Sequence, residues 1–277
     1  MSEARQCIFI TGAGSGIGRA TAKLFAAKGW FVGAYDVDTA GLESLQSELG
    51  AGDCLARRLD VTDKVDFDAA VAEFGERTGG RLDLLFNNAG IGHGGWLEDV
   101  PYEATLRVVQ VNLVGVLNGI YAALPLLKNT ANSLCFTTSS SSATYGMPGI
   151  AVYSATKHAV KGLTEALAVE FSRCGVRAAD VLPGLIDTAI LRSTPVHSSD
   201  LPAPEDPTAN APKRGPFRAM PPESVADAVW KAYHSDRLHW YVPPGIAWLD
   251  RIKAFAPRFL RNRFARMTQR ALSKASH

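Results

Sequence analysis

Short apolar runs alternate with longer helical patterns along most of this chain, and this alternation constrains its fold most strongly. Buried strands are expected at residues 7–11, 30–36, 54–59, 82–86, 133–138, 176–182 and 239–242. Helices are expected between them, at residues 16–28, 39–49, 65–76, 102–127, 152–174 and 223–235. Strands that are apolar on both faces and joined by helices form parallel sheets. The sequence therefore predicts an α/β fold with a doubly wound parallel sheet flanked by helices.

The composition favours one large domain with a short tail. The chain has 277 residues, of which 47% are hydrophobic and 20% charged, enough for a single large core. Residues 1–247 are predicted to form this domain, and residues 248–277 a separate C-terminal tail. The segment 192–222 interrupts the alternation and holds eight of the fifteen prolines, so it is predicted to be an insertion.

Charge and cysteine usage exclude several classes of protein. A net charge of +2 gives no reason to expect nucleic acid as a partner. The four cysteines are scattered without a C-x-x-C pair or another metal-ligand spacing, so no metal site is predicted. No signal peptide precedes the first expected strand, and no apolar run reaches the roughly 18 residues of a membrane span. These features favour a cytoplasmic protein with reduced cysteines.

A glycine-rich segment joins the first expected strand to its helix. In Thr11-Gly-Ala-Gly-Ser-Gly-Ile-Gly18, the glycines at 12, 16 and 18 follow a G-x-x-x-G-x-G spacing. Residues without a side chain let the backbone turn tightly and approach a pyrophosphate, whose charge meets the helix N-terminus. A strand before and a helix after favour a Rossmann-type dinucleotide site over an ordinary turn.

Asp36 ends the second expected strand, near the position where an acid accepts hydrogen bonds from a ribose diol. A carboxylate there repels a 2′-phosphate, and neither Val37 nor Ser15 supplies a cation to bind one. Arg19 carries a charge, but it also fits a solvated residue of the first helical turn. The balance favours NAD over NADP, and an acid that only caps a turn is the alternative.

Tyr153 and Lys157 lie four residues apart in an expected helix, and Ser140 precedes the tyrosine by thirteen residues. Positions i and i+4 share a helix face, so the phenol and the ammonium are expected to point into the same cleft. A nearby cation stabilises a phenolate and lowers the pKa of a phenol from its usual value of about 10. Such a pair transfers protons near neutral pH, as the interconversion of an alcohol and a ketone requires.

In this order, the motifs resemble the short-chain dehydrogenase/reductase superfamily, in the branch with TGxxxGIG, NNAG and YxxxK motifs. The match runs from about Gln6 to Val242 and includes further segments: Asp60-Val61, Asn87-Asn-Ala-Gly90, Asn112, Ser140 and Pro183-Gly-Leu-Ile-Asp-Thr188. The resemblance implies a Rossmann-fold oxidoreductase that acts on CH-OH groups with a nicotinamide cofactor. It also implies a homo-oligomer, a dimer or a tetramer, assembled through the long helices.

The resemblance further implies a role for each matching residue. Tyr153 would transfer the proton, Ser140 would stabilise the oxyanion, and Lys157 would lower the tyrosine pKa and hold the ribose. Asn112 would kink its helix and link Lys157 to solvent through water. The implied cofactor contacts are Gly12, Ser15, Gly16, Ile17, Gly18, Asp36, Asp60, Val61, Asn88, Ala89, Gly90, Tyr153, Lys157, Pro183, Gly184, Ile186 and Thr188. Ser139 and Ser142 remain alternatives to Ser140.

The loops on the expected substrate side are mostly apolar. They offer Ile91, Trp96, Tyr145, Met147, Ile150, Leu191 and Phe217. This wall favours a hydrophobic alcohol or ketone, such as a steroid-, retinoid- or acyl-like compound, and the segment 192–222 is interpreted as its substrate loop. His93 is expected to be incidental. Two other functions stay open: an NADP-linked carbonyl reductase, and an inactive NAD-binding regulatory protein, against which the intact Ser140, Tyr153 and Lys157 argue.

The C-terminal tail, residues 248–277, is basic. From Asp250 onward it has eight Lys/Arg residues and one acid. It is predicted to carry two apolar rows with arginines on the opposite faces, interrupted at Pro257: Trp248/Ile252/Phe255 and Leu260/Phe264/Met267/Ala271. Basic amphipathic helices bind membrane surfaces, which makes peripheral membrane contact one interpretation. Packing on the α/β domain or on a second subunit is the favoured alternative.

Overall fold

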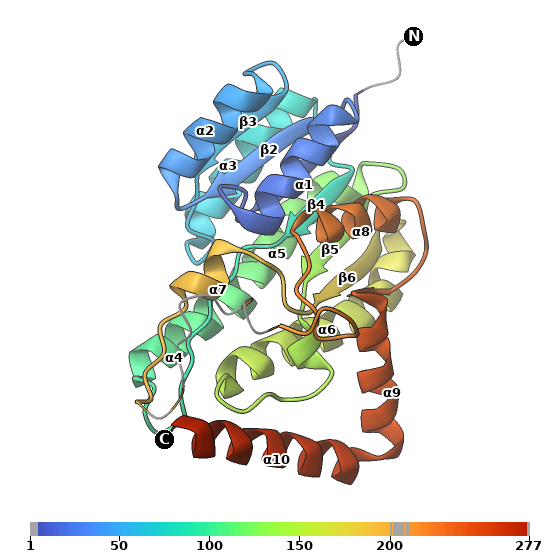
Figure 1. Ribbon diagram of the computed structural model, residues 1–277. Coiled ribbons are helices and arrows are strands. Elements are labelled where there is room, and N and C mark those ends of the chain that lie inside the picture. The colour runs from blue at the N-terminus through green and yellow to red at the C-terminus, as the bar shows by residue number, and fades with distance from the viewer. Residues whose placement is uncertain (1–4, 200, 202–207, 209–210, 276–277) are drawn as a thin grey trace.

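The computed structural model describes residues 5–199, 201, 208 and 211–275 (Figure 1). Among these residues, one parallel sheet has the strand order β3-β2-β1-β4-β5-β6-β7. Its strands are β1 (Cys7–Thr11), β2 (Phe31–Asp36), β3 (Cys54–Arg58), β4 (Leu84–Asn87), β5 (Leu134–Thr138), β6 (Arg177–Pro183) and β7 (His239–Val242). The predicted doubly wound α/β fold is confirmed.

Helices cover both faces of the sheet. One face carries α1 (Gly16–Ala27), α2 (Thr39–Leu49) and α8 (Glu223–Tyr233), and the other carries α3 (Lys64–Thr78), α5 (Gly115–Lys128) and α6 (Ala151–Glu170). The remaining helices are α4 (Tyr102–Val109), α7 (Ala189–Ser193), α9 (Ala247–Phe255) and α10 (Pro257–Ala275).

Strand β1 shows why the sequence folds in this way. Ile8 and Ile10 are buried in the apolar core on the α1/α8 face, whereas Phe9 is buried in the core on the α3/α5 face. Successive side chains of a strand point to opposite faces, so a strand covered on both sides must be apolar throughout.

The sheet reverses its strand order at β1. This strand pairs with β2 on one side and with β4 on the other. In open α/β sheets, ligands bind at such a switch point, in the crevice beyond the carboxyl ends of the strands. The glycine-rich segment after β1 and the Asn-Asn-Ala-Gly segment after β4 therefore meet at this crevice.

The helix predicted at 102–127 is present, but it is not regular. A π-helical segment, Gln110–Val114, separates α4 from α5 and contains Asn112. π-Helical turns occur mostly at functional sites. Among the described residues, the run Tyr102–Lys128 is also the one helix long and apolar enough to cross a membrane, but half of its apolar window is buried inside the protein. We attribute its composition to packing against α3.

The described residues of the segment 192–222 are held to the loops that follow β4 and β6. The segment begins within α7 and forms two isolated bridges, Gly94 with Val196 and Ile186 with Met220. Residues 200, 202–207 and 209–210 of this predicted substrate loop lie outside the described part of the chain.

The basic tail forms α9 and α10, two helices at a steep angle to each other: α9 runs down one side of the domain and α10 crosses the bottom of the view (Figure 1). Leu260 and Phe264 of α10 are buried, whereas Trp248 and Phe255 of α9 are exposed. Ala271 belongs to the side chains that the structure leaves undescribed. The expectation that arginines face away from both apolar rows is wrong for α9, because the Arg251 guanidinium lies 5.0 Å from the centre of the Trp248 ring.

Candidate active site

A cleft of about 440 Å³ opens at the carboxyl edge of the sheet, at the switch point. It brings together predicted site residues from the ends of six strands and from α6: Gly12, Ser15, Gly16, Ile17, Asp36, Asp60, Val61, Asn88, Ala89, Gly90, Ser140, Tyr153, Lys157, Pro183, Gly184, Ile186 and Thr188. Two predicted residues, Gly18 and Asn112, do not line it.

The glycine turn after β1 is closed too tightly for side chains. Gly12 has a φ of 70°, and a Cβ on it would lie 2.9 Å from the Ala89 Cα atom. A Cβ on Gly18 would lie 2.0 Å from the Gly12 carbonyl oxygen. Gly18 therefore lets α1 start directly against the turn, and backbone amides at its N-terminus can face an anion.

Hydrogen bonds join the ends of β1, β4 and β5 under the cleft. The Thr11 hydroxyl accepts hydrogen bonds from the backbone amides of Asn88 at 3.0 Å and Ala89 at 3.1 Å. The side-chain amide nitrogen of Asn88 donates to the Thr11 carbonyl at 3.1 Å. The side-chain oxygen of Asn88 accepts from the Thr138 hydroxyl at 3.1 Å. These bonds hold the floor of the cleft rigid.

Asp36 sits at the edge of the cleft, at the end of β2. Its carboxylate accepts hydrogen bonds from the Gly14 amide at 2.9 Å and the Asp38 amide at 3.0 Å. Arg19 does not line the cleft, because its guanidinium donates to the Gly41 carbonyl at 3.0 Å and pairs with Glu48 at 3.0 Å. The α2 helix thus holds the Arg19 guanidinium away from the cleft.

Asp60 lies at the same end of the cleft. Burial acts to raise its pKa, but hydrogen bonds from Thr62 and Arg107 outweigh this and lower it to about 2. Arg107 also lines the cleft and pairs with Asp60 at 3.0 Å. Arg107 was not identified from the sequence, because an arginine on a surface helix is usually solvated. Only the fold shows that α4 brings it beside the end of β3.

Lys157 is 3% exposed and lies on α6 below the cleft. Its ammonium donates a hydrogen bond of 2.8 Å to the Thr138 carbonyl at the end of β5. Burial lowers the pKa of Lys157 to about 8. This amine is therefore held in place by the backbone of the sheet, and a large part of its solvation is lost.

Tyr153 lies one helical turn before Lys157, with its ring centre 5.7 Å from the ammonium. Burial raises the pKa of Tyr153, and a hydrogen bond from Ser140 acts in the opposite direction. The predicted lowering of this pKa by Lys157 is therefore not observed. The physical reason is that both groups lie out of water, and Lys157 donates to a carbonyl rather than to the phenol.

The three candidate serines, Ser139, Ser140 and Ser142, differ in their contacts with the cleft. Ser140 lines the cleft and hydrogen-bonds to Tyr153. Ser139 also borders the cleft, but its hydroxyl donates to the Lys157 carbonyl at 2.9 Å. Ser142 is buried outside the cleft lining. Ser140 is thus the serine placed beside the phenol.

Asn112 lies fully buried in the π-helical segment. Its side chain accepts from the Ile91 amide at 2.9 Å and donates to the Ile91 carbonyl at 2.9 Å. A Cβ on Gly90 would lie 3.3 Å from the Asn112 Oδ1 atom and 3.6 Å from the Lys157 Nζ atom. Gly90 therefore leaves space between these two polar groups, and Asn112 orients the strand end beside them.

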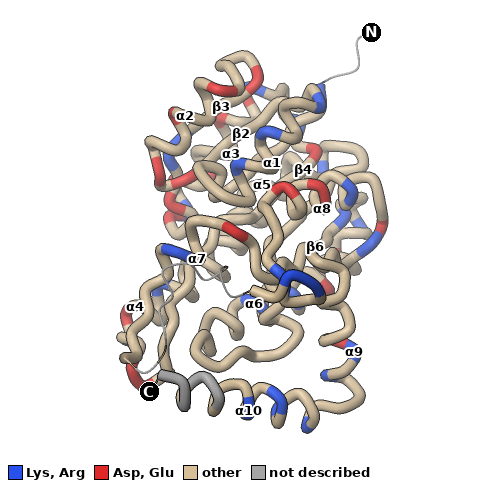
Figure 2. Tube along the Cα trace, viewed as in Figure 1, with Lys and Arg blue, Asp and Glu red and all other residues tan. Residues whose placement is uncertain are grey.

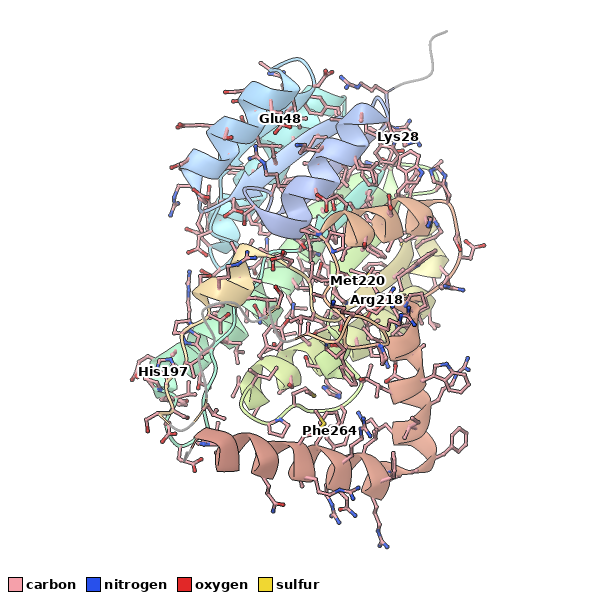
Figure 3. All side chains as sticks on the ribbon, in the orientation of Figure 1. Lys28, Glu48, His197, Arg218, Met220 and Phe264 are labelled. Atoms are coloured by element: carbon pink, nitrogen blue, oxygen red, sulfur yellow. The ribbon has the colours of Figure 1, made fainter. Side chains whose placement is uncertain are left out.

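Only part of the expected apolar wall faces the cleft. Ile91 and Leu191 line it, and Ile150 borders a small adjoining pocket with Tyr153. Tyr145 instead stacks on Phe264 of α10, with ring centres 4.8 Å apart, and Figure 3 shows Phe264 on the side of α10 that faces the domain.

The other expected wall residues, Trp96, Met147 and Phe217, are absent from the lining of the described pockets. His93, expected to be incidental, borders the small pocket and pairs with His197, with ring nitrogens 3.0 Å apart. This pair joins the loop after β4 to the segment after α7.

Comparisons with known proteins agree with this geometry. A family model described as short chain dehydrogenase matches residues 6–198. The chain is 37% identical to cyclohexanol dehydrogenase of Acinetobacter sp. (strain SE19), over 66% of this chain and 73% of the relative. It is 35% identical to levodione reductase of Leifsonia aquatica, over 68% and 72%. A solved short chain dehydrogenase/reductase from Burkholderia phymatum, in complex with NAD, superposes with a TM-score of 0.79 at 28% identity, over 94% of this chain and 97% of that one.

Proposed function

We propose an NAD(H)-dependent enzyme for a hydrophobic substrate, starting from the premise that the chain belongs to the short chain dehydrogenase family. Family membership makes it an oxidoreductase that interconverts alcohols and ketones and binds a nicotinamide cofactor. The proposed substrate is a secondary or primary alcohol, or its ketone or aldehyde, of steroid-, retinoid- or acyl-like character. The observation that carries the proposal is the placement of Ser140, Tyr153 and Lys157 in the same cleft as the glycine turn.

The residues of the cleft fit a nicotinamide dinucleotide. The glycine turn would hold the pyrophosphate through its backbone amides. Side chains at Gly12 and Gly18 would clash with the neighbouring backbone, so only glycine permits this tight turn. Asp60, Val61 and the Asn88–Gly90 segment would hold the adenine side, and the Pro183–Thr188 segment the nicotinamide side. When bound, the nicotinamide supplies or accepts the hydride. The protein supplies orientation and charge.

NAD is the proposed cofactor rather than NADP. The Asp36 carboxylate would accept hydrogen bonds from a ribose diol and repel a 2′-phosphate. Arg19 could offset that repulsion only by breaking its contacts with Gly41 and Glu48. The charge distribution at this end of the cleft thus supports the unphosphorylated cofactor.

Proton transfer is assigned to Tyr153. Its phenol would exchange the proton with the substrate oxygen, and Ser140 would hydrogen-bond the same oxygen as charge develops on it. The Lys157 ammonium would favour the phenolate and hold the ribose hydroxyl groups of the cofactor. Asn112 would connect Lys157 to solvent through a water molecule in the space beside Gly90.

A screen of the purified protein tests the proposal. Apolar alcohols and ketones would be offered with NAD(H) and with NADP(H), and the absorbance of the reduced cofactor followed. We expect turnover of cyclic and long-chain substrates with NAD(H), and kcat/KM at least about tenfold lower with NADP(H). A preference for NADP(H) would overturn the cofactor assignment. Tight NADH binding without turnover on the whole panel would instead favour a regulatory protein.

The proposed assembly is a homo-oligomer formed through the long helices. Tyr102 and Leu106 of α4, Tyr121 of α5 and Val169 of α6 are exposed apolar side chains. These exposed apolar groups on neighbouring helices would fit a contact face between two copies. A second copy that covers α4–α5 and α6 would also hold Asn112 and Tyr153 in place from outside.

A further inference from the structure

Among the described residues of α9 and α10, large aromatic side chains lie on the outer surface near the corner between the two helices. We refer to Trp248, Phe255 and Phe259 as the aromatic ridge. Their exposed fractions are 62%, 90% and 52%. Trp248 and Phe255 are seven residues apart, so they share one face of α9. Leu260 and Phe264 form the face of the tail that is buried against the domain. The ridge is therefore a second apolar surface that packing of the tail does not explain.

The exposed charges of α9 and α10 have one sign. Within the described side chains of α9 and α10, every exposed charged residue is an arginine: Arg251, Arg258, Arg261, Arg263 and Arg266. Asp250, the acid of this region, turns inward, where it accepts hydrogen bonds from Lys161 at 2.7 Å and from Tyr241. Figure 2 shows basic residues along both helices. No exposed carboxylate offsets them in this part of the chain.

We propose that α9 and α10 dock the protein onto an anionic lipid bilayer. The aromatic ridge would enter the boundary between headgroups and acyl chains, where amphipathic aromatic rings are favoured. The arginines would contact lipid phosphates, to which a planar guanidinium binds with two parallel hydrogen bonds. The Arg251 guanidinium already lies over the Trp248 ring at 5.0 Å, so one aromatic and one cationic group are presented together.

Charge complementarity favours a lipid surface over a second copy of the chain. A two-fold contact through this face would place the same patch on both sides. Exposed arginines would then oppose exposed arginines, with no exposed acid of α9 or α10 to pair with them. An anionic bilayer offers the opposite charge and an apolar layer beneath it. It therefore satisfies both features of the patch at once.

The tail is fixed to the domain firmly enough to act as a docking element. Lys161 of α6 pairs with Asp250 of α9 at 2.7 Å, and the Lys253 ammonium lies 3.0 Å from the Nε2 atom of His158 on α6. At the other end, Phe264 stacks on Tyr145. Docking through the ridge would thus hold α6, which carries Tyr153, at a set distance from the bilayer.

Vesicle co-sedimentation of the full-length protein tests the proposal without requiring turnover. The vesicles would contain phosphatidylcholine alone, or phosphatidylcholine with about one third phosphatidylglycerol. We expect the wild-type protein to pellet with the anionic vesicles and to be released by high salt. Replacement of Trp248 and Phe255 by serine should lower the partition coefficient by about tenfold for each aromatic residue. Replacement of Arg258, Arg263 and Arg266 by glutamine should lower it about fivefold for each arginine.

A matched control is Val65→Ser, which removes an apolar group of 79% exposed fraction from α3. It should leave vesicle binding unchanged. Equal and negligible pelleting of the wild-type protein on both kinds of vesicle would overturn the proposal. Light scattering on the Trp248/Phe255 double variant gives an independent check. Loss of an oligomer in that variant, without vesicle binding by the wild type, would assign the ridge to contact between copies instead.

Discussion

The Lys157 ammonium lies 5.7 Å from the centre of the Tyr153 ring and donates its hydrogen bond to the Thr138 carbonyl. The sheet, and not the phenol, therefore fixes the position of this amine. In the proposed mechanism, the Lys157 charge would favour the Tyr153 phenolate across this space, out of water, where such interactions are stronger than in bulk solvent. A buried amine of this kind is expected to serve activity at the expense of stability.

Replacement of Lys157 by methionine should abolish turnover and stabilise the fold at neutral pH. Burial lowers the folded-state pKa from 10.5 to about 8, so the unfolded chain binds the proton more tightly. The buried charge of Lys157 therefore destabilises the folded state fully below pH 8, and this destabilisation disappears as the pH rises toward 10.5. The gain in unfolding free energy should be up to about 3 kcal/mol near pH 7 and much smaller near pH 10. Denaturant unfolding at both pH values measures it.

The matched control is Lys161→Met, one turn further along α6. Lys161 pairs with Asp250 at 2.7 Å, so its loss leaves a half-buried carboxylate without its cation. This variant should lose stability and keep turnover. A Lys157→Met protein that is destabilised equally at both pH values would contradict the assignment of a buried, strained charge.

Replacement of Asp36 by alanine should shift the enzyme toward NADP(H). The carboxylate would no longer bind the ribose diol or repel a 2′-phosphate, so KM for NAD should rise by about tenfold. KM for NADP should fall, as measured by steady-state kinetics with both cofactors. Asp38→Ala is the control, because Asp38 is also an acid at this turn but caps α2 through the Gly41 amide. It should cost about 1 kcal/mol of stability and leave cofactor choice unchanged.

Replacement of Phe264 by alanine should loosen the tail and the segment that carries Ser140. Phe264 is buried and stacks on Tyr145, so its loss should weaken docking of α10 by about 3 kcal/mol. Amides of α10 should then exchange about a hundredfold faster, and KM for bulky substrates should rise more than KM for small ones. Phe259→Ala removes a half-exposed ring from the same helix and should change neither exchange nor KM. Equal exchange rates in both variants would refute the role of the Tyr145 contact.

An arginine at position 121 should dissociate the proposed oligomer. Tyr121 is 70% exposed on α5, and a charge there would be buried without a partner in an interface. Light scattering should report an oligomer for the wild type and a monomer for Tyr121→Arg. Val65→Arg, on α3, should keep the wild-type mass. An unchanged mass for Tyr121→Arg would place the interface elsewhere.

Most of the fold follows from local pattern. The strands and the helices between them were predicted within about two residues in nearly every case, because a sheet covered on both faces requires uninterrupted apolar runs. The family resemblance implied a kink at Asn112, but periodicity did not predict the π-helical segment around it. Its side chain satisfies the Ile91 amide and carbonyl, a contact between distant parts of the chain that periodicity does not encode.

The C-terminal tail shows more clearly what periodicity cannot predict. Periodicity predicted two apolar rows, but it could not tell which row meets the domain. Phe264 is buried because Tyr145 lies opposite it, and Trp248 is exposed because α9 turns Asp250 inward toward Lys161. Partners far away in the sequence decide both outcomes.

The same reason applies within the site. Motif spacing placed Ser140, Tyr153 and Lys157 together, but the direction of the tyrosine pKa depends on burial by the surrounding fold. Arg107 enters the cleft only because α4 passes the end of β3, where it meets Asp60. Residues that act through such packing carry no local sequence signal.

The most direct measurement compares wild-type and Tyr153→Phe proteins under the same conditions. NADH formation from cyclohexanol and larger apolar alcohols would be followed, and NADH binding titrated by fluorescence. The account predicts a fall in kcat of about a thousandfold with an NADH dissociation constant changed by less than about threefold, since the phenylalanine removes only the proton donor. Turnover by Tyr153→Phe at the wild-type rate would contradict the central claim that this phenol transfers the proton.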